Sequence, residues 1–227
     1  DQCELSPMGV HTGQADLDWR VFRIMSELVQ GFEFLTGLVE DVTVLGTKSE
    51  DLESRFYKQA EQLGKELANN GFAVVTGGAS GIAESANKGA MEVGGESIGL
   101  AMEVEGNQRI NEYVTRSLMF QFPFTRKLIV SAPSKSFVFF PGGLGTMHHL
   151  FEVLTLMQTG KMERIPIILF GAEYWEPLDA YIVDVLAKKM QTIAVEDTNL
   201  YHIVDSVDDA MTIINSFREQ RVGKKVL

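Results

Sequence analysis

The sequence predicts an α/β fold, a Rossmann-like parallel sheet with helices on both faces and an additional N-terminal helix. Short apolar runs alternate with stretches whose apolar residues recur at helical spacing, and most of these runs are apolar at consecutive positions. Such runs are typical of strands buried on both faces of a parallel sheet. Two glycine-rich segments, 76–81 and 141–146, each separate an apolar run from a helical pattern. This order favours right-handed crossovers between parallel strands.

In the first half of the chain, most elements begin or end at a recognisable residue. Apolar spacing predicts a helix over 21–35, and a run closed by Gly46 predicts a strand over 42–45. Ser49 is a candidate N-cap for the next helix, which Gly71 is expected to end. The further elements expected before Pro133 are a strand over 72–75, a helix over 82–93, a strand over 97–100 and a helical region carrying Leu118, Phe122 and Arg126.

The second half repeats the strand–loop–helix pattern. An aromatic run over 137–140 predicts a buried strand, and helical spacing resumes over 149–157 after the second glycine-rich segment. Because the phenylalanines of this run alternate within an apolar strand, core packing is favoured over base stacking. The last expected elements are a strand over 165–170, a helix over 178–190, a short strand near Ile193 and a helix over 206–218.

Length, charge and cysteine content limit the class of protein. We expect a disordered tail over 1–16 and a single nucleotide-binding domain over 17–227, because 227 residues with 45% hydrophobic content suit one core. No signal peptide or membrane span is visible, so we expect a cytoplasmic protein with no membrane partner. The net charge of −11 argues against a nucleic-acid partner. Cys3, the single cysteine, cannot form a disulfide within the chain.

The two glycine-rich segments are the first candidates for a binding site. Both are expected at the carboxyl ends of strands, where ligands bind to parallel sheets. Glycines permit close approach of the backbone, and free N–H groups at the start of each following helix attract phosphate oxygens. For either segment alone, the alternative that its glycines only make a tight turn stays open. The expected phosphate- and nucleotide-binding residues are Gly77, Gly78, Gly81, Gly142, Gly143, Gly145 and Thr146.

The second of these segments, 141–146, reads PGGLGT and resembles the PGGxGTxxE signature of LOG proteins, also described as possible lysine decarboxylases. The resemblance runs from the helix at 18–27, through 76–78 and 87–90, to 169–175. It implies a nucleoside 5′-monophosphate phosphoribohydrolase, which splits AMP-like or cytokinin nucleotides into free base and ribose 5-phosphate. It also implies a homodimer that uses no metal and no cofactor.

The resemblance suggests a catalytic role for Arg126, because Arg126-Lys127 resembles an Arg-Lys element of the family. The chain departs from the signature at its last position, where His149 replaces the glutamate. A carboxylate near the ribose stabilises the positive charge that develops on the sugar, and histidine supplies no permanent negative charge. Glu152 lies three residues further on nearly the same helix face. It is expected to steady the imidazole of His149, to replace part of the missing carboxylate, or to be solvated helix surface.

Two functions therefore stay open. The protein is an active nucleotide N-glycosidase whose candidate catalytic residues are Arg126, His149 and Glu152, or it binds nucleotides on the same fold without efficient turnover. A metal site is not expected. The adjacent His148 and His149 would point about 100° apart on a helix, and no spaced histidine or cysteine completes a ligand set.

Overall fold

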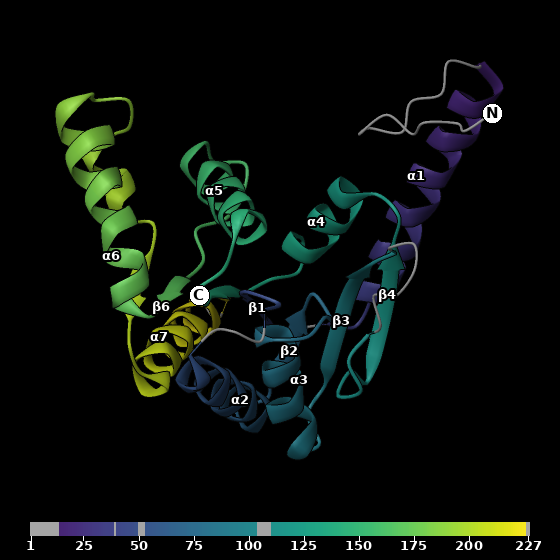
Figure 1. Ribbon diagram of the computed structural model, residues 1–227, viewed down its shortest axis with the longest axis horizontal. Helices are drawn as coiled ribbons and strands as arrows, with labels where there is room; N and C mark the ends of the chain where they lie inside the picture. The colour runs from purple at the N-terminus through teal and green to yellow at the C-terminus, as the bar shows by residue number, and fades with distance from the viewer. Residues whose placement is uncertain (1–13, 39, 50–52, 104–109, 226–227) are drawn as a thin grey trace.

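The computed structural model describes residues 14–38, 40–49, 53–103 and 110–225. Within them, seven parallel strands form one sheet in the order β4-β3-β2-β1-β5-β6-β7 (Figure 1). The strands are β1 (Asp41–Leu45), β2 (Ala73–Thr76), β3 (Ser97–Met102), β4 (Arg116–Phe120), β5 (Ser136–Phe139), β6 (Ile167–Phe170) and β7 (His202–Val204). The predicted fold class is confirmed.

Helices cover both faces of this sheet. The α-helices are α1 (Gln14–Leu35), α2 (Ser54–Asn69), α3 (Ile82–Glu92), α4 (Pro123–Ser131), α5 (Leu144–Gln158), α6 (Ala172–Ala180) and α7 (Val207–Lys225). A π-helical segment, η1 (Tyr181–Lys189), continues α6, and a short 3-10 helix, η2 (Val195–Asn199), precedes β7. Figure 1 shows α2, α3 and α7 on one side of the sheet and α1, α4, α5 and α6 on the other. None of the helices, as far as they are described, is long and apolar enough to cross a membrane.

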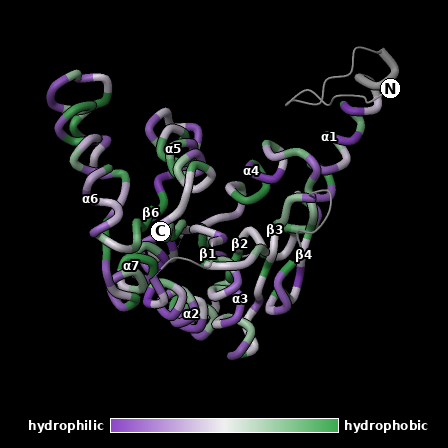
Figure 2. The backbone as a smooth tube through the Cα atoms, in the orientation of Figure 1, coloured by the Kyte–Doolittle hydropathy of each residue, from purple (hydrophilic) through white to green (hydrophobic). Residues whose placement is uncertain are grey.

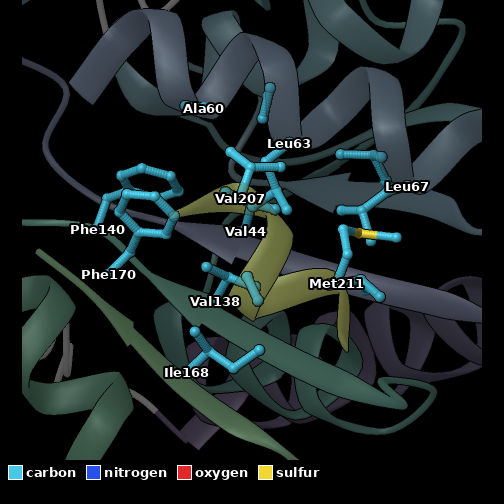
Figure 3. Close-up of a cluster of buried hydrophobic side chains, with 14 of the residues drawn as sticks. Val44, Ala60, Leu63, Leu67, Val138, Phe140, Ile168, Phe170, Val207 and Met211 are labelled. Carbon is cyan, nitrogen blue, oxygen red and sulfur yellow. The ribbon is translucent and has the colours of Figure 1, made fainter. Parts of the chain in front are cut away.

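Successive strand residues point to opposite faces and so build two separate hydrophobic layers. On the side of α2, α3 and α7, Val44 and Val138 pack with Leu63 and Met211, as Figure 3 shows. On the other side, Phe137 and Phe139 belong to a layer that includes side chains from α4, α5 and α6. The two phenylalanines are fully buried, which confirms the prediction that this strand packs in the core.

Helices α2 and α3 cross at a point where only glycine fits. A methyl group on Gly64 of α2 would overlap the backbone carbonyl of Ala86, and one on Gly89 of α3 would overlap the carbonyl of Glu61. The backbones of the two helices therefore approach each other directly. This contact fixes how α3, and the glycine-rich loop in front of it, sit on the sheet.

Three predicted details are wrong. Leu118 lies in β4 rather than in a helix, because residues 116–120 pair with 98–102 of β3, and the helix starts only at Pro123. Ser49 does not cap α2, which begins at Ser54 with Glu53 at the N-cap and no side-chain cap. Ile193 is not in a strand; the last strand of the sheet is β7, which pairs with β6. The predicted tail over 1–16 lies mostly outside the described residues.

The N-terminal helix is confirmed, but most of its large apolar side chains are not buried in the chain. Along α1, hydrophobic and hydrophilic segments alternate (Figure 2). Five of its large apolar side chains are 50–72% exposed: Trp19, Phe22, Met25, Val29 and Phe32. Among the residues of α1 whose burial is described, 19–35, the buried one is Gly31, which lies against Ile129 of α4. Helix α1 therefore packs on α4 through a small residue and presents apolar surface outward.

Candidate functional site

The strand order places a topological switch point between β1 and β5. From β1 the chain adds strands toward β4, and from β5 it adds them toward β7. Ligands of open α/β sheets bind at the carboxyl ends of strands at such a point. The loops there are tied together, since Thr47 N–H donates to the carbonyl of Pro141 at 2.9 Å and Ile82 N–H donates to the carbonyl of Thr47 at 3.1 Å. The loops after β1, β2 and β5 thus form one unit.

The loop after β5 presents open backbone donors. Gly143 is the N-cap of α5, and no hydrogen bond within the described residues uses the N–H groups of Gly143, Leu144 or Gly145. A methyl group on Gly143 or Gly145 would meet no atom within 4 Å, so the space beside the loop is free. Behind it, the side chain of Thr146 is buried and packs against Gly142. Open N–H groups at a helix start are donors of the kind that can bind an anion.

The loop after β2 offers fewer open backbone donors than the loop after β5. The N–H of Gly78 donates to the hydroxyl of Thr76 at 3.0 Å, so this donor is already used within the protein. Gly78 and Gly81 have φ angles of +68° and +75°, a conformation that favours glycine. Both glycines therefore meet the requirements of a tight turn. Of the predicted residues in this loop, Gly77 is the one that borders a charged side chain of the site.

That side chain is Arg126 on α4. Its Nη2 atom lies 2.8 Å from the position that a Cβ on Gly77 would take, and its Nε–H donates to the carbonyl of Leu100 at 2.5 Å. Burial lowers the pKa of Arg126, although a guanidinium stays protonated in proteins. No carboxylate pairs with it among the described residues. A mostly buried cation without a counter-charge, beside a glycine loop, is suited to bind an anion.

His149 lies in the core rather than at an open surface. Its side chain is 5% exposed and packs against the rings of Phe137 and Phe139, with centroids 5.7 and 6.3 Å away. Nε2 of His149 lies 3.1 Å from the hydroxyl oxygen of Ser131. Burial, reinforced by the charge of Arg126, lowers the pKa of His149 to about 3. The imidazole is therefore neutral at neutral pH.

Glu152 has a different neighbour from the one expected. Its carboxylate lies 4.0 Å from Nζ of Lys127, and Nζ lies 2.9 Å from Nε2 of His148. Among the described contacts, none joins Glu152 to His149. The Ser131 contact of His149 had no signal in the sequence, whereas Lys127 belongs to the Arg-Lys element. The described residues contain no group of three side chains able to hold a metal ion.

A buried polar network, missed from the sequence, holds the loop after β2. Asn87 is fully buried; its amide oxygen accepts from Thr76 at 2.6 Å and from Asn111 at 3.0 Å, and its amide nitrogen donates to Ser97 at 2.7 Å. Asn111 also donates to the carbonyl of Ala79 at 3.1 Å. Asn87 falls in the 87–90 segment quoted for the resemblance, but a lone asparagine gives no indication of its partners.

Comparison with known sequences gives two family matches. The profile of the family described as "Possible lysine decarboxylase" matches residues 83–214, and that of "DNA recombination-mediator protein A" matches residues 32–133. A cytokinin riboside 5′-monophosphate phosphoribohydrolase from Rhodococcoides fascians is 27% identical over 132 residues, which cover 57% of this chain and 67% of that protein.

Solved structures share the fold. The molybdenum cofactor binding protein of Rippkaea orientalis superposes with a TM-score of 0.61 at 21% identity, covering 78% of this chain and 96% of that chain. The molybdenum cofactor carrier protein of Chlamydomonas reinhardtii gives 0.61 at 23% identity, covering 79% and 98%. DNA processing protein A of Streptococcus pneumoniae gives 0.51 at 18% identity, covering 79% and 62%. At these identities, the similarity shows the fold alone.

Proposed function

This chain belongs to the possible lysine decarboxylase, or LOG, family, and on that premise we propose that it binds a nucleoside 5′-monophosphate and slowly hydrolyses its N-glycosidic bond. The observation that carries the proposal is the position of Arg126, which lies beside Gly77 without a carboxylate partner among the described residues. The relative from Rhodococcoides fascians bears the name of such a hydrolase.

The geometry supports a phosphate as the anchoring group. A phosphate carries several acceptor oxygens, and the start of α5 offers open N–H groups together with the positive end of the helix dipole. Arg126 offers a planar set of donors from the neighbouring helix. The net charge of −11 supports a small ligand that is held by local donors rather than a long polyanion.

In the proposed reaction, water replaces the base at C1′ of the ribose. The bond between C1′ and the base nitrogen breaks with its electron pair going to the base. The oxygen of water bonds to C1′; one proton of that water goes to the base nitrogen and the other stays on the oxygen as the new anomeric hydroxyl, which gives free base and ribose 5-phosphate. Positive charge builds on the sugar in this step, so a nearby carboxylate accelerates it. His149 is neutral and buried, and we therefore expect a slow reaction.

A second candidate function is nucleotide binding without turnover. The state of His149 favours it, because the side chain at the signature position contacts Ser131 and two phenylalanine rings and carries no charge at neutral pH. A protein of this kind would hold or carry its ligand by the same phosphate contacts.

We also propose a homodimer, as the family resemblance implies. Exposed apolar side chains flank the site on two helices: Phe124 and Leu128 on α4, and Leu144 and Phe151 on α5. Leu144 is 90% exposed at the start of α5. Clustered apolar surface of this kind is typical of protein interfaces.

The deciding experiment incubates the pure protein with AMP, GMP, CMP and isopentenyl-AMP. Isothermal titration measures binding, and chromatography measures free base and ribose 5-phosphate. Release of both products in equal amounts supports the hydrolase. Binding without release supports the second candidate, whereas absence of both binding and release contradicts the proposed function.

A further inference from the structure

Helix α1 contacts α4 at three successive levels. The guanidinium of Arg20 lies 5.3 Å from the ring centre of Phe122, the carboxylate of Glu27 lies at the start of α4, and Gly31 is so close to Ile129 that a methyl group would overlap that side chain. The first contact places a cation over an aromatic ring, the second is a set of hydrogen bonds to a carboxylate, and the third is close packing of a glycine against an isoleucine. The position of α4 therefore depends on α1.

The central contact joins Glu27 of α1 to the segment at the start of α4. One carboxylate oxygen of Glu27 accepts the N–H of Gln121 at 2.6 Å, and the other accepts the N–H of Phe122 at 3.4 Å and the hydroxyl of Thr125. Both N–H groups belong to the two residues just before Pro123, the first residue of α4, and Phe122 at the N-cap makes no side-chain cap of its own. A carboxylate at a helix start both satisfies free donors and interacts favourably with the helix dipole.

The segment that Glu27 contacts, 121–125, leads directly into Arg126. The N–H of Arg126 makes the first backbone bond of the first turn of α4, to the carbonyl of Phe122 at 3.2 Å, and Arg126 directly follows Thr125. Its side chain then reaches the carbonyl of Leu100 and Gly77. A small rotation of this turn would move the guanidinium at the end of a long side chain by a larger distance.

We propose that Glu27 is a positioning residue for the ligand site, through which α1 sets the place of Arg126. The proposal rests on the proposed function, because it assigns Arg126 to the anion site. Glu27 acts through the start of α4: among the described residues, its hydrogen-bond partners are Gln121, Phe122 and Thr125.

The test compares Glu27→Ala and Glu27→Gln with Glu33→Gln, which alters an exposed carboxylate on the same helix. AMP affinity is measured by isothermal titration, and the Nε–H signal of Arg126 is followed by NMR. We expect Glu27→Ala to weaken AMP binding about tenfold, the loss typical of a missing carboxylate at a helix start, and to abolish the protected Nε–H signal. Glu27→Gln keeps one oxygen acceptor, so its AMP affinity should lie between those of Glu27→Ala and the wild type. Glu33→Gln should match the wild type.

The two readouts separate this inference from the proposed function. If wild-type protein does not bind AMP, the proposed function fails, while the Nε–H signal still reports whether Glu27 positions Arg126. If wild-type protein binds AMP and Glu27→Ala changes neither affinity nor signal, the positioning role is wrong. Should Glu27→Ala fail to fold, Thr125→Val removes the hydroxyl that contacts both the Glu27 carboxylate and the carbonyl of Phe122. A severalfold loss of affinity is expected, and wild-type affinity together with an unchanged signal overturns the inference.

Discussion

Nε2 of His149 and the hydroxyl of Ser131 lie 3.1 Å apart in the buried layer between α4 and α5. The position at which the family signature has a glutamate is therefore occupied by a neutral ring that forms part of the core. Burial and the charge of Arg126 keep this ring unprotonated far below neutral pH. The proposed binding and the proposed catalysis are therefore separable: the residues proposed to bind an anion, Arg126 and the start of α5, are present, whereas the carboxylate of the family signature is not.

His149→Glu tests this separation. We expect the substitution to raise kcat for AMP roughly tenfold to a thousandfold and to leave affinity comparatively unchanged, because the carboxylate acts mainly as positive charge develops on the ribose. Steady-state kinetics on both proteins measure the effect, and His148→Glu, at the exposed neighbouring position, is the control. A wild type that is already fast and is slowed by the change would identify His149 as a working catalytic residue.

Arg126→Ala should weaken AMP binding about tenfold to a hundredfold, since hydrogen bonds from a charged donor contribute about 1.5–3 kcal/mol. The free energy of unfolding should fall by no more than about 1–3 kcal/mol, because the variant loses the hydrogen bond to the carbonyl of Leu100 but no ion pair among the described residues. Titration calorimetry and urea denaturation measure the two quantities. Arg23→Ala removes the same charge from an exposed position of α1 and should leave AMP binding unchanged. Equal AMP affinities for the wild type, Arg126→Ala and Arg23→Ala would show that Arg126 does not take part in AMP binding.

Gly145→Ala separates the binding role of the second loop from its structural role. A methyl group has free space there and alanine favours a helix, so stability should hold or rise by about 0.5–1 kcal/mol. The methyl group would nevertheless lie beside the open N–H groups, and we expect AMP affinity to fall at least severalfold. Gly64→Ala is the contrasting variant; its overlap with Ala86 should cost about 1–3 kcal/mol. An unchanged affinity in Gly145→Ala would mean that the phosphate does not lie on this loop.

Asp41 at the start of β1 predicts a pH dependence of stability. It is fully buried, and neither carboxylate oxygen has a hydrogen-bond partner within the described residues. Burial, partly offset by the charge of Lys135, raises the pKa of Asp41 from 3.8 to about 7. The folded state thus holds a proton that the unfolded state releases above pH 4, and Asp41 makes the protein less stable as pH rises from about 4 through 7.

Asp41→Asn should therefore stabilise the protein above pH 7 by about 2–4 kcal/mol relative to the wild type, and the difference should vanish near pH 4. Urea denaturation of both proteins at a series of pH values measures it. Asp184→Asn alters an exposed pair with Lys188 and should change stability little at any pH. A constant difference between wild type and Asp41→Asn across this range would show that Asp41 does not titrate there.

The sequence predicted the parallel sheet, because consecutive apolar residues such as Val74 and Val75 of β2 are buried on both faces. The prediction missed β4, because Leu118, Phe122 and Arg126 are spaced as in one helix. In the structure a strand ends after Leu118, and a helix begins before Arg126. Only pairing with β3 decides between these structures, and that pairing joins residues far apart in the sequence.

Of the candidate site, only the glycine loops and Arg126 could be predicted from the sequence. Glycine loops and the Arg-Lys element are local patterns, and the structure brings Gly77 and Arg126 together. The sequence could not show that Gly78 N–H is already bonded to Thr76, or that His149 contacts Ser131. Both facts depend on side-chain directions across elements.

The backbone bonds that join Thr47 to Pro141 and Ile82 to Thr47 also limit how this protein can move. Hinge closure between the two halves of the sheet would have to break the bond from Thr47 to Pro141, so the loops after β1, β2 and β5 should move as one rigid unit. If the proposed function is correct, adaptation to bases of different size then depends on the helices around these loops. Exchange on the microsecond-to-millisecond timescale should accordingly concentrate in α4 and α1 rather than at Gly142.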